Sequence, residues 1–257
     1  MKAMKQEKYD NSGAYQVIAR LYDKLMGDGK YPDWEKLIRE VAIKYQIKTG
    51  VCLDIACGTG NISRFLVEAG FKVVGVDAST EMIAIAGKKL PSERFVRADI
   101  RDFDLGAGFT AAPFAVSFYD SLNYLLSDKD MLSAFLAVSR HLKPGGIFLF
   151  DMNPMDHVAI AQKFRPRVFK EDDWYSVFQF GGKDRFWTLD IDLFTKEPSG
   201  LYRLDREQHV ERGYNKEHIL PLLEQAGFAP LEVREQYKVY EDGEKHLSRL
   251  YFITKKQ

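Results

Sequence analysis

A short apolar run that opens into a glycine-containing loop and then a helix constrains the fold of this chain most. The segment reads Val51-Cys52-Leu53-Asp54-Ile55-Ala56-Cys57-Gly58-Thr59-Gly60-Asn61-Ile62-Ser63. Val51–Ile55 predicts a buried strand, and residues 61–69 carry apolar side chains at helical spacing. Glycines in such a loop allow a sharp turn and the close approach of a ligand. The segment therefore predicts an α/β sheet with a ligand site at the carboxyl end of this strand, or a tight connection without a ligand.

The rest of the chain alternates between apolar runs and helical periodicity up to residue 151, which favours a largely parallel sheet. We expect further strands at 72–76, 95–97, 114–118 and 147–151, and helices at 14–27, 32–46, 80–89 and 129–141. Residues 152–213 change to alternating, aromatic-rich segments that are typical of antiparallel strands. A helix at 216–226 and strands at 231–237 and 247–254 follow. The pattern predicts an α/β core (1–151 and 214–257) with an antiparallel insertion (152–213) after the fifth strand.

Composition narrows the function. The 37 Lys and Arg residues balance 37 Asp and Glu residues, so the chain has no general electrostatic attraction to nucleic acid or an anionic membrane. No stretch approaches about 18 consecutive apolar residues, and the N-terminus lacks the apolar region of a secretory signal. The two cysteines, Cys52 and Cys57, lie in one motif and cannot staple a fold of this size. We expect a reduced, cytoplasmic protein without a membrane span.

An acidic residue lies at or near the carboxyl end of each of the first three expected strands. Asp77 is placed to accept hydrogen bonds from both hydroxyls of a ribose, although it or Ser79 would also suit a helix N-cap. Asp99 suits an exocyclic adenine amine with Ile100 packing on the base, or it is a solvated loop residue. Asp54 would repel a pyrophosphate and would suit an ammonium group. Together the three acids favour an adenosine ligand with a cationic end over a dinucleotide.

These motifs resemble those of class I S-adenosylmethionine-dependent methyltransferases. The matching segments, in the expected order, are Asp54-Ile55-Ala56-Cys57-Gly58-Thr59-Gly60, Asp77, Ala98-Asp99-Ile100 and Leu142-Lys143-Pro144-Gly145-Gly146. The resemblance implies a Rossmann-like, doubly wound, seven-stranded sheet whose last strand is antiparallel. It also implies S-adenosylmethionine across the carboxyl edge of this sheet, with S-adenosylhomocysteine as the product.

The resemblance also assigns residues to the cofactor. It places Gly58 and Gly60 against the methionine part, Asp77 on the ribose and Asp99 on the adenine amine. Ala56 departs from the family pattern, because many members have glycine there, but alanine is small enough that binding should survive. The cofactor-binding residues that we expect are Asp54, Ala56, Gly58, Gly60, Asp77, Ala78, Asp99, Ile100, Ser117 and Phe118.

The candidate catalytic residues are Tyr22, Tyr119 and His157. Residues 1–47 are expected to form a helical lid, and their segment 15–25 resembles the lid helix of small-molecule methyltransferases. In that lid, Tyr22 would stand over the sulfonium, where an aromatic face favours a cation, or would pack between helices. Tyr119 follows the fourth strand, and His157 follows the fifth as a candidate base.

Three further candidates, Trp34, Asp120 and Asn123, have a functional and a structural interpretation. Trp34 resembles Tyr22 as an aromatic candidate, with helix packing favoured. Asp120 and Asn123 lie on the acceptor side, where Asp120 would equally cap a helix. We place His209 and His218 at the surface or in the insertion, and no histidine has the spacing of a metal ligand.

The leading hypothesis is methyl transfer to a small molecule by in-line displacement, which depends on proximity and orientation. The insertion is similar to that of sugar-amine and small-metabolite N-methyltransferases, where it roofs the pocket and often builds a dimer. Its aromatic residues would equally form the insertion's own core. A tRNA or protein acceptor, a non-catalytic binding module and an NAD-dependent oxidoreductase are the alternatives. The neutral charge favours a small molecule over a nucleic acid partner.

Overall fold

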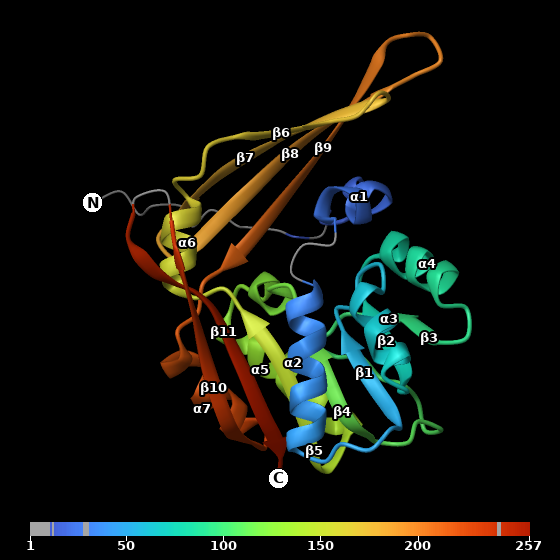
Figure 1. The fold of residues 1–257 in the computed structure, drawn as a ribbon, viewed down its shortest axis with the longest axis vertical. Helices are drawn as coiled ribbons and strands as arrows, with labels where there is room; N and C mark the ends of the chain where they lie inside the picture. Colours follow the sequence, from blue (N-terminus) through green and yellow to red (C-terminus); the bar gives the residue numbers. More distant parts are fainter. Residues whose placement is uncertain (1–10, 12, 28–30, 241–242) are drawn as a thin grey trace.

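The computed structural model describes residues 11, 13–27, 31–240 and 243–257. Its main layer is a seven-stranded sheet in the order β10-β11-β5-β4-β1-β2-β3 (Figure 1). The strands are β1 (Val51–Ile55), β2 (Lys72–Asp77), β3 (Arg94–Arg97), β4 (Ala112–Ser117), β5 (Leu142–Met152), β10 (Phe228–Val239) and β11 (Lys245–Lys256). Strands β1 to β5 are parallel, whereas β11 is antiparallel to both of its neighbours. The predicted Rossmann-like sheet with an antiparallel last strand is confirmed.

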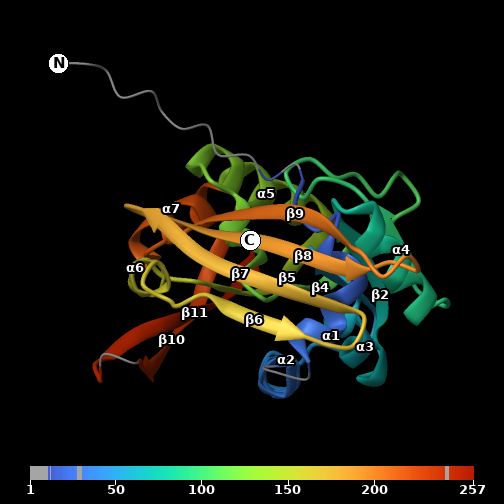
Figure 2. The same cartoon turned by 90° about the horizontal axis from the view of Figure 1, so that it is seen from above.

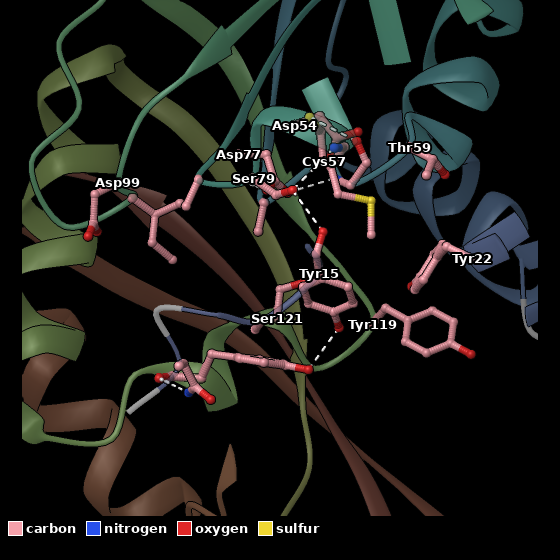
Figure 3. Close-up of a pocket in the computed structure, with 18 of the residues that line it drawn as sticks. Tyr15, Tyr22, Asp54, Cys57, Thr59, Asp77, Ser79, Asp99, Tyr119 and Ser121 are labelled. Atoms are coloured by element: carbon pink, nitrogen blue, oxygen red, sulfur yellow. Dashed lines mark hydrogen bonds between the residues drawn. The ribbon is translucent and has the colours of Figure 1, made fainter. Parts of the chain in front are cut away.

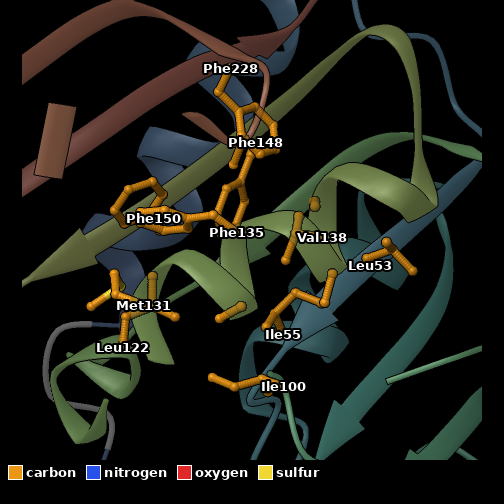
Figure 4. Packing of buried hydrophobic residues seen from close by; sticks show 14 of the residues in the cluster. Leu53, Ile55, Ile100, Leu122, Met131, Phe135, Val138, Phe148, Phe150 and Phe228 are labelled. Atoms are coloured by element: carbon orange, nitrogen blue, oxygen red, sulfur yellow. The ribbon is translucent and has the colours of Figure 1, made fainter. Parts of the chain in front are cut away.

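Helices cover both faces of this sheet, because successive strand residues point to opposite sides. Cys52 belongs to the cluster that packs under α2 (Tyr31–Lys44) and α3 (Asn61–Glu68). Its neighbour Leu53 belongs to the larger cluster under α5 (Asp128–His141) and α7 (Lys216–Gln225), part of which Figure 4 shows. The helix α4 (Thr80–Lys89) lies between β2 and β3. The sheet is therefore doubly wound, as predicted.

A second sheet stands over the carboxyl edge of the first (Figures 1 and 2). Its strands, each antiparallel to the next, are β6 (Arg167–Lys170), β7 (Trp174–Lys183), β8 (Phe186–Lys196) and β9 (Tyr202–Arg212). This sheet confirms the predicted antiparallel insertion. The short strand β6 and the helix α6 (Met155–Ala161) were not expected. No helix among the described residues is long and apolar enough to cross a membrane.

The predicted continuous helix over 14–27 is wrong. The structure has a 3-10 turn, η1 (Ile18–Leu21), followed by the short helix α1 (Tyr22–Met26). The carboxylate of Glu207 in β9 accepts hydrogen bonds from the backbone N–H groups of Tyr15, Val17 and Ile18, at 2.7–3.3 Å. These donors are therefore satisfied by a side chain of the insertion, which replaces helical hydrogen bonds there. The parts of the expected lid at residues 1–10, 12 and 28–30, and the expected absence of a secretory signal, lie outside the described residues.

Candidate active site

The carboxyl ends of β1 and β2 meet at the glycine loop. Parallel pairing sets Ile55 beside Val76, so the loop after β1 lies next to the acid that ends β2. Asp77 Oδ2 accepts a hydrogen bond from the backbone N–H of Gly58 at 2.8 Å, and Oδ1 accepts one from Ser79 at 2.9 Å. These loops line a cavity of about 750 Å³, together with the segments after β3 and β4 and the N-terminal segment (Figure 3).

Most of the residues selected from the sequence line this cavity. They are Asp54, Ala56, Gly58, Asp77, Ala78, Asp99, Ile100 and Phe118 of the expected cofactor set, and Tyr22 and Tyr119 of the expected catalytic set. The structure therefore brings together side chains from four strand ends and from the N-terminal segment.

Three of the selected residues do not line the cavity. Gly60 has a left-handed backbone, with φ at 80°, and a Cβ there would lie 3.3 Å from the Cβ of Ala86 in α4, so this glycine permits close packing. Ser117 is buried, and its hydroxyl has no hydrogen-bond partner among the residues that the structure describes. His157 lies in α6, where its Nδ1 is 2.9 Å from the hydroxyl of Tyr240.

Asp54 is a buried carboxyl that lines the cavity. It is 2% exposed, and the hydroxyl of Ser63 donates a hydrogen bond to its Oδ2 at 2.6 Å. Burial raises the pKa of Asp54 to about 7, the Ser63 hydroxyl opposes that rise, and the negative charge of Asp77 adds to it. A cation beside this carboxyl would favour its ionised form.

Asp99 is already paired in the structure. The guanidinium of Arg101 contacts both carboxylate oxygens of Asp99, and its Nε lies 2.9 and 3.0 Å from them. These hydrogen bonds hold the pKa of Asp99 below its usual range in spite of partial burial. Arg101 also reaches Asp130 at 3.3 Å. Asp99 is thus a fixed, ionised acceptor at the cavity wall, and it is neither buried nor freely solvated.

Aromatic side chains form another wall of the cavity. The ring of Tyr22 packs edge-on against Tyr15 at 5.8 Å and against Tyr119 at 6.4 Å between centroids. Tyr119 also has a left-handed backbone, with φ at 64°. Trp34 is 1% exposed and lies behind this wall, 5.0 Å from the Tyr119 ring centroid. The packing role of Trp34 is therefore the one that the structure shows.

A contact between α1 and the glycine loop, which we call the latch, has no signal in the sequence. The Asp23 carboxylate accepts hydrogen bonds from Thr59 Oγ1 at 2.6 Å, from Asn61 Nδ2 at 3.0 Å and from Lys89 Nζ at 2.8 Å. Despite burial, which acts in the opposite direction, these partners lower the pKa of Asp23. The latch holds α1 over the rim of the cavity.

A buried charged network lies next to Trp34, whose ring centroid is 5.7 Å from the guanidinium carbon of Arg249. Arg249 Nη1 contacts Asp120 at 2.9 Å and Asp151 at 2.7 Å, and all three residues are buried. Asn153 donates to Asp120 at 2.9 Å and to Glu211 at 3.1 Å. Burial, followed by the charge of Asp120, raises the pKa of Glu211 well above its usual range. Asp120 therefore makes neither a cavity wall nor a side-chain helix cap.

Sequence reasoning also missed a chain of polar groups that joins the cavity to the insertion. Tyr15 and Tyr124 line the cavity, and their hydroxyls lie 2.8 Å apart. Behind them, His209 and Glu207 in β9 are 3% and 5% exposed. His209 lies in the insertion, as expected, but faces inward. No group of three or more metal-ligating residues occurs among the described residues.

Comparison with known proteins agrees with this architecture. Residues 52–146 match the model of a methyltransferase domain. The chain is also 34% identical over 253 residues to YqeM, a methyltransferase-family protein of Bacillus subtilis (strain 168), and the match covers 94% of this chain and 97% of that one. The chain therefore belongs to the class I S-adenosylmethionine-dependent methyltransferases, and it is an enzyme of this class.

Two further relatives extend the comparison. A crystal structure of an S-adenosylmethionine-dependent methyltransferase from Clostridium acetobutylicum ATCC 824 superposes with a TM-score of 0.79 at 28% identity, covering 94% of this chain and 98% of that one. The dTDP-3-amino-3,6-dideoxy-alpha-D-glucopyranose N,N-dimethyltransferase of Streptomyces fradiae is 31% identical over 137 residues, which is 52% of each chain. The first likeness covers nearly the whole fold, whereas the second covers half.

Proposed function

We propose that this enzyme transfers a methyl group from S-adenosylmethionine to a small-molecule acceptor by in-line displacement. The observation that carries the proposal is the composition of the cavity. Its lining includes the carboxyl groups of Asp54, Asp77 and Asp99 at the strand ends, and an aromatic wall that includes Tyr15 and Tyr22. Carboxylates suit a cationic cofactor, and an aromatic wall with hydroxyl groups suits a small polar acceptor better than a polyanion.

The cavity residues fit S-adenosylmethionine, which supplies an electrophilic methyl group on a sulfonium. Asp54 would hold the ammonium group, since its buried carboxyl has no cationic partner among the described residues. A Cβ added to Gly58 would meet nothing within 4 Å, so the backbone there leaves room for a ligand. Asp77 would accept from the ribose hydroxyls, because its carboxylate has acceptor capacity beyond the backbone hydrogen bonds that it takes up.

The remaining residues would complete the site. Asp99 would accept from the adenine amine, with Ile100 against the base. The rings of Tyr22 and Tyr119 would face the sulfonium, where the negative face of an aromatic ring stabilises a cation. By surrounding the reacting groups, these rings would also exclude water and fix the line of attack.

Two observations support a small molecule as the methyl acceptor. The N-terminal segment is fastened over the cavity by Glu207, and the side chain of Asn11 also pairs with the backbone of Val210, at 2.8 and 2.9 Å. Such a cover favours an acceptor small enough to be enclosed. The Streptomyces fradiae relative is named for an amino sugar joined to a nucleotide. We therefore propose a small metabolite with an amino or hydroxyl group as the acceptor class.

The test uses the enzyme with methyl-labelled S-adenosylmethionine and a cell extract divided by size. We expect label in the low-molecular-weight fraction, identified by mass spectrometry. The Asp77→Ala variant should reduce the labelling at a limiting cofactor concentration. Label that appears only in tRNA or protein would contradict the small-molecule assignment. Binding of S-adenosylhomocysteine without label in any fraction would instead indicate a non-catalytic binding module.

A further inference from the structure

Four side chains form a continuous polar chain from the cavity into the insertion. The hydroxyls of Tyr15 and Tyr124 lie 2.8 Å apart, and the Tyr124 hydroxyl lies 2.9 Å from His209 Nδ1. The other ring nitrogen of His209, Nε2, lies 2.7 Å from Glu207 Oε1. Tyr15 and Tyr124 line the cavity, whereas His209 and Glu207 are buried behind them. The first two separations are those of hydrogen bonds, whereas the contact between His209 Nε2 and Glu207 is close but is not aligned as a hydrogen bond.

The environment of Glu207 determines which groups of this polar chain donate hydrogen bonds and which accept them. Its carboxylate accepts from the backbone N–H groups of Tyr15, Val17 and Ile18. Although burial opposes the shift, His209 and these N–H groups lower the pKa of Glu207. An ionised carboxylate 2.7 Å from Nε2 repels a lone pair there and attracts an N–H group, although the contact is not aligned as a hydrogen bond. The tautomer with the proton on Nε2 is therefore favoured, which leaves Nδ1 to accept.

The remaining directions follow from that tautomer. Tyr124 donates its hydroxyl proton to His209 Nδ1, and its oxygen accepts from the hydroxyl of Tyr15. The Tyr15 oxygen then keeps acceptor capacity for a donor in the cavity. The hydroxyls therefore donate in one direction, from Tyr15 to Tyr124 and from Tyr124 to His209. The four groups together can take up one proton from the cavity.

We propose that His209 is the base that finally receives the proton lost by the methylated substrate. The hydroxyls of Tyr15 and Tyr124 carry that proton from the cavity to His209. This inference rests on the proposed methyl transfer. The lone pair of the acceptor nitrogen or oxygen forms the bond to the methyl carbon, and the carbon–sulfur bond breaks with its electron pair on sulfur. The acceptor's proton moves to Tyr15 while Tyr15 passes its own to Tyr124 and Tyr124 passes its own to His209. The resulting imidazolium is stabilised by the carboxylate of Glu207.

Neighbouring charges favour histidine over tyrosine as the end point. Burial raises the pKa of Tyr15 and of Tyr124, and the carboxyl groups of Glu211 and Asp120 act in the same direction. A tyrosinate is therefore disfavoured at both positions, whereas Glu207 favours a positive charge on His209. The two tyrosines therefore transmit the proton and do not keep it.

The carboxylate of Glu207 also makes this proton relay (Tyr15, Tyr124, His209 and Glu207) depend on the position of the N-terminal segment. Glu207 holds the backbone of the N-terminal segment, and Tyr15, the relay residue nearest the start of the chain, belongs to that segment. The relay is therefore complete only when the segment is docked on β9. Proton uptake and the enclosure of the cavity thus depend on one residue.

The first test measures the His209 tautomer directly. Imidazole nitrogens of ¹⁵N-histidine-labelled enzyme are followed by NMR from pH 5 to 9, with S-adenosylhomocysteine as the probe ligand. We expect the neutral His209 ring to carry its proton on Nε2. A proton on Nδ1 would overturn the proposal, because Tyr124 would then be unable to donate to it. This readout does not depend on turnover.

The second test measures methyl transfer to the low-molecular-weight extract fraction at saturating labelled S-adenosylmethionine. Tyr124→Phe should lower the rate by about 100-fold, as expected for loss of general-base catalysis. Tyr240→Phe is the matched control, because it also removes a tyrosine hydroxyl 2.9 Å from a histidine, but outside the cavity. It should leave the rate unchanged.

The pH profile separates a proton acceptor from a structural residue. The rate of the unmodified enzyme should fall at low pH with the same midpoint as the His209 titration seen by NMR, and His209→Gln should remove that limb. An unchanged midpoint in His209→Gln, or a Tyr124→Phe rate within about twofold of the unmodified enzyme, would overturn the relay. If the unmodified enzyme labels nothing, the proposed small-molecule function fails. The NMR measurement of the His209 tautomer still tests whether Tyr124 donates to His209.

Discussion

The carboxylate of Asp77 accepts a hydrogen bond from the backbone N–H of Gly58, so the end of β2 is joined to the glycine loop after β1. The neighbouring Ser79 resolves which residue caps α4, because its Oγ accepts from the backbone N–H of Met82 at 3.2 Å. Asp77 is thereby left on the cavity side, where its oxygens accept from the backbone N–H groups of Gly58 and Ser79. One carboxylate thus fixes the loop and faces the proposed ribose position.

The first prediction concerns this carboxylate. Asp77→Ala should weaken S-adenosylhomocysteine binding by at least ~1.5 kcal/mol, about tenfold, because a charge-assisted hydrogen-bond acceptor is lost. Isothermal titration calorimetry measures the change. Asp190→Ala, which removes an exposed acid in β8, should bind as the unmodified enzyme does. Equal affinities in the two variants would place the ribose elsewhere.

The sequence predicted those parts of the site that depend on local pattern and on parallel topology. The strand–glycine–helix segment is local, and Asp54, Asp77 and Asp99 converge because parallel strands end at the same edge. The expected roles of these residues stay predictions until ligand binding is measured. The sheet was predictable for the same reason, because each of its elements carries its own period.

The cover of the cavity was not predictable in this way. Glu207 lies about 190 residues from the backbone N–H groups that it binds, and no periodicity links such distant positions. This contact also explains why helical periodicity over 14–27 misled, since tertiary hydrogen bonds replaced the helical ones. His157 was selected for its place after a strand, but α6 carries it to Tyr240.

The second prediction concerns the departure at Ala56. Its backbone is left-handed, with φ at 56°, which costs a residue with a Cβ about 1–2 kcal/mol. Ala56→Gly removes that strain but adds freedom to the unfolded chain, so we expect a net gain in unfolding free energy of about 0.5–1 kcal/mol. Chemical denaturation measures it. Ala115→Gly, in the buried centre of β4, should instead lose stability. A loss at Ala56 as well would argue against strain.

The third prediction concerns pH and Asp54. Burial raises its pKa to about 7, whereas a carboxyl in the unfolded chain ionises near pH ~4. The stability that the neutral carboxyl contributes is therefore present below about pH 4 and is lost as pH rises through about 7. Asp54→Asn should make the ligand-free protein more stable than the unmodified protein at pH 8, and their melting temperatures should converge towards pH 5.

Binding should change in the opposite direction. Asp54→Asn should weaken S-adenosylhomocysteine by about tenfold or more at pH 8, because the ammonium group loses its carboxylate. The affinity of the unmodified protein should fall below pH 7, while that of the variant should stay nearly constant from pH 6 to 8. A variant that is more stable yet binds equally well at pH 8 would show that the ammonium lies elsewhere.

The fourth prediction concerns the latch formed by Asp23. Its carboxylate joins α1 to Thr59, Asn61 and Lys89, but it does not line the cavity. Asp23→Ala should therefore act mainly on release, raising the dissociation rate of S-adenosylhomocysteine about tenfold, because α1 no longer holds the rim closed. Stopped-flow displacement gives the rate. Lys24→Ala is the control, because it breaks only the exposed pair with Glu171, and exposed pairs contribute about 0–1 kcal/mol. Unchanged release in Asp23→Ala would mean that α1 is held in place by its packing, chiefly the buried contacts of Tyr22, and not by the latch.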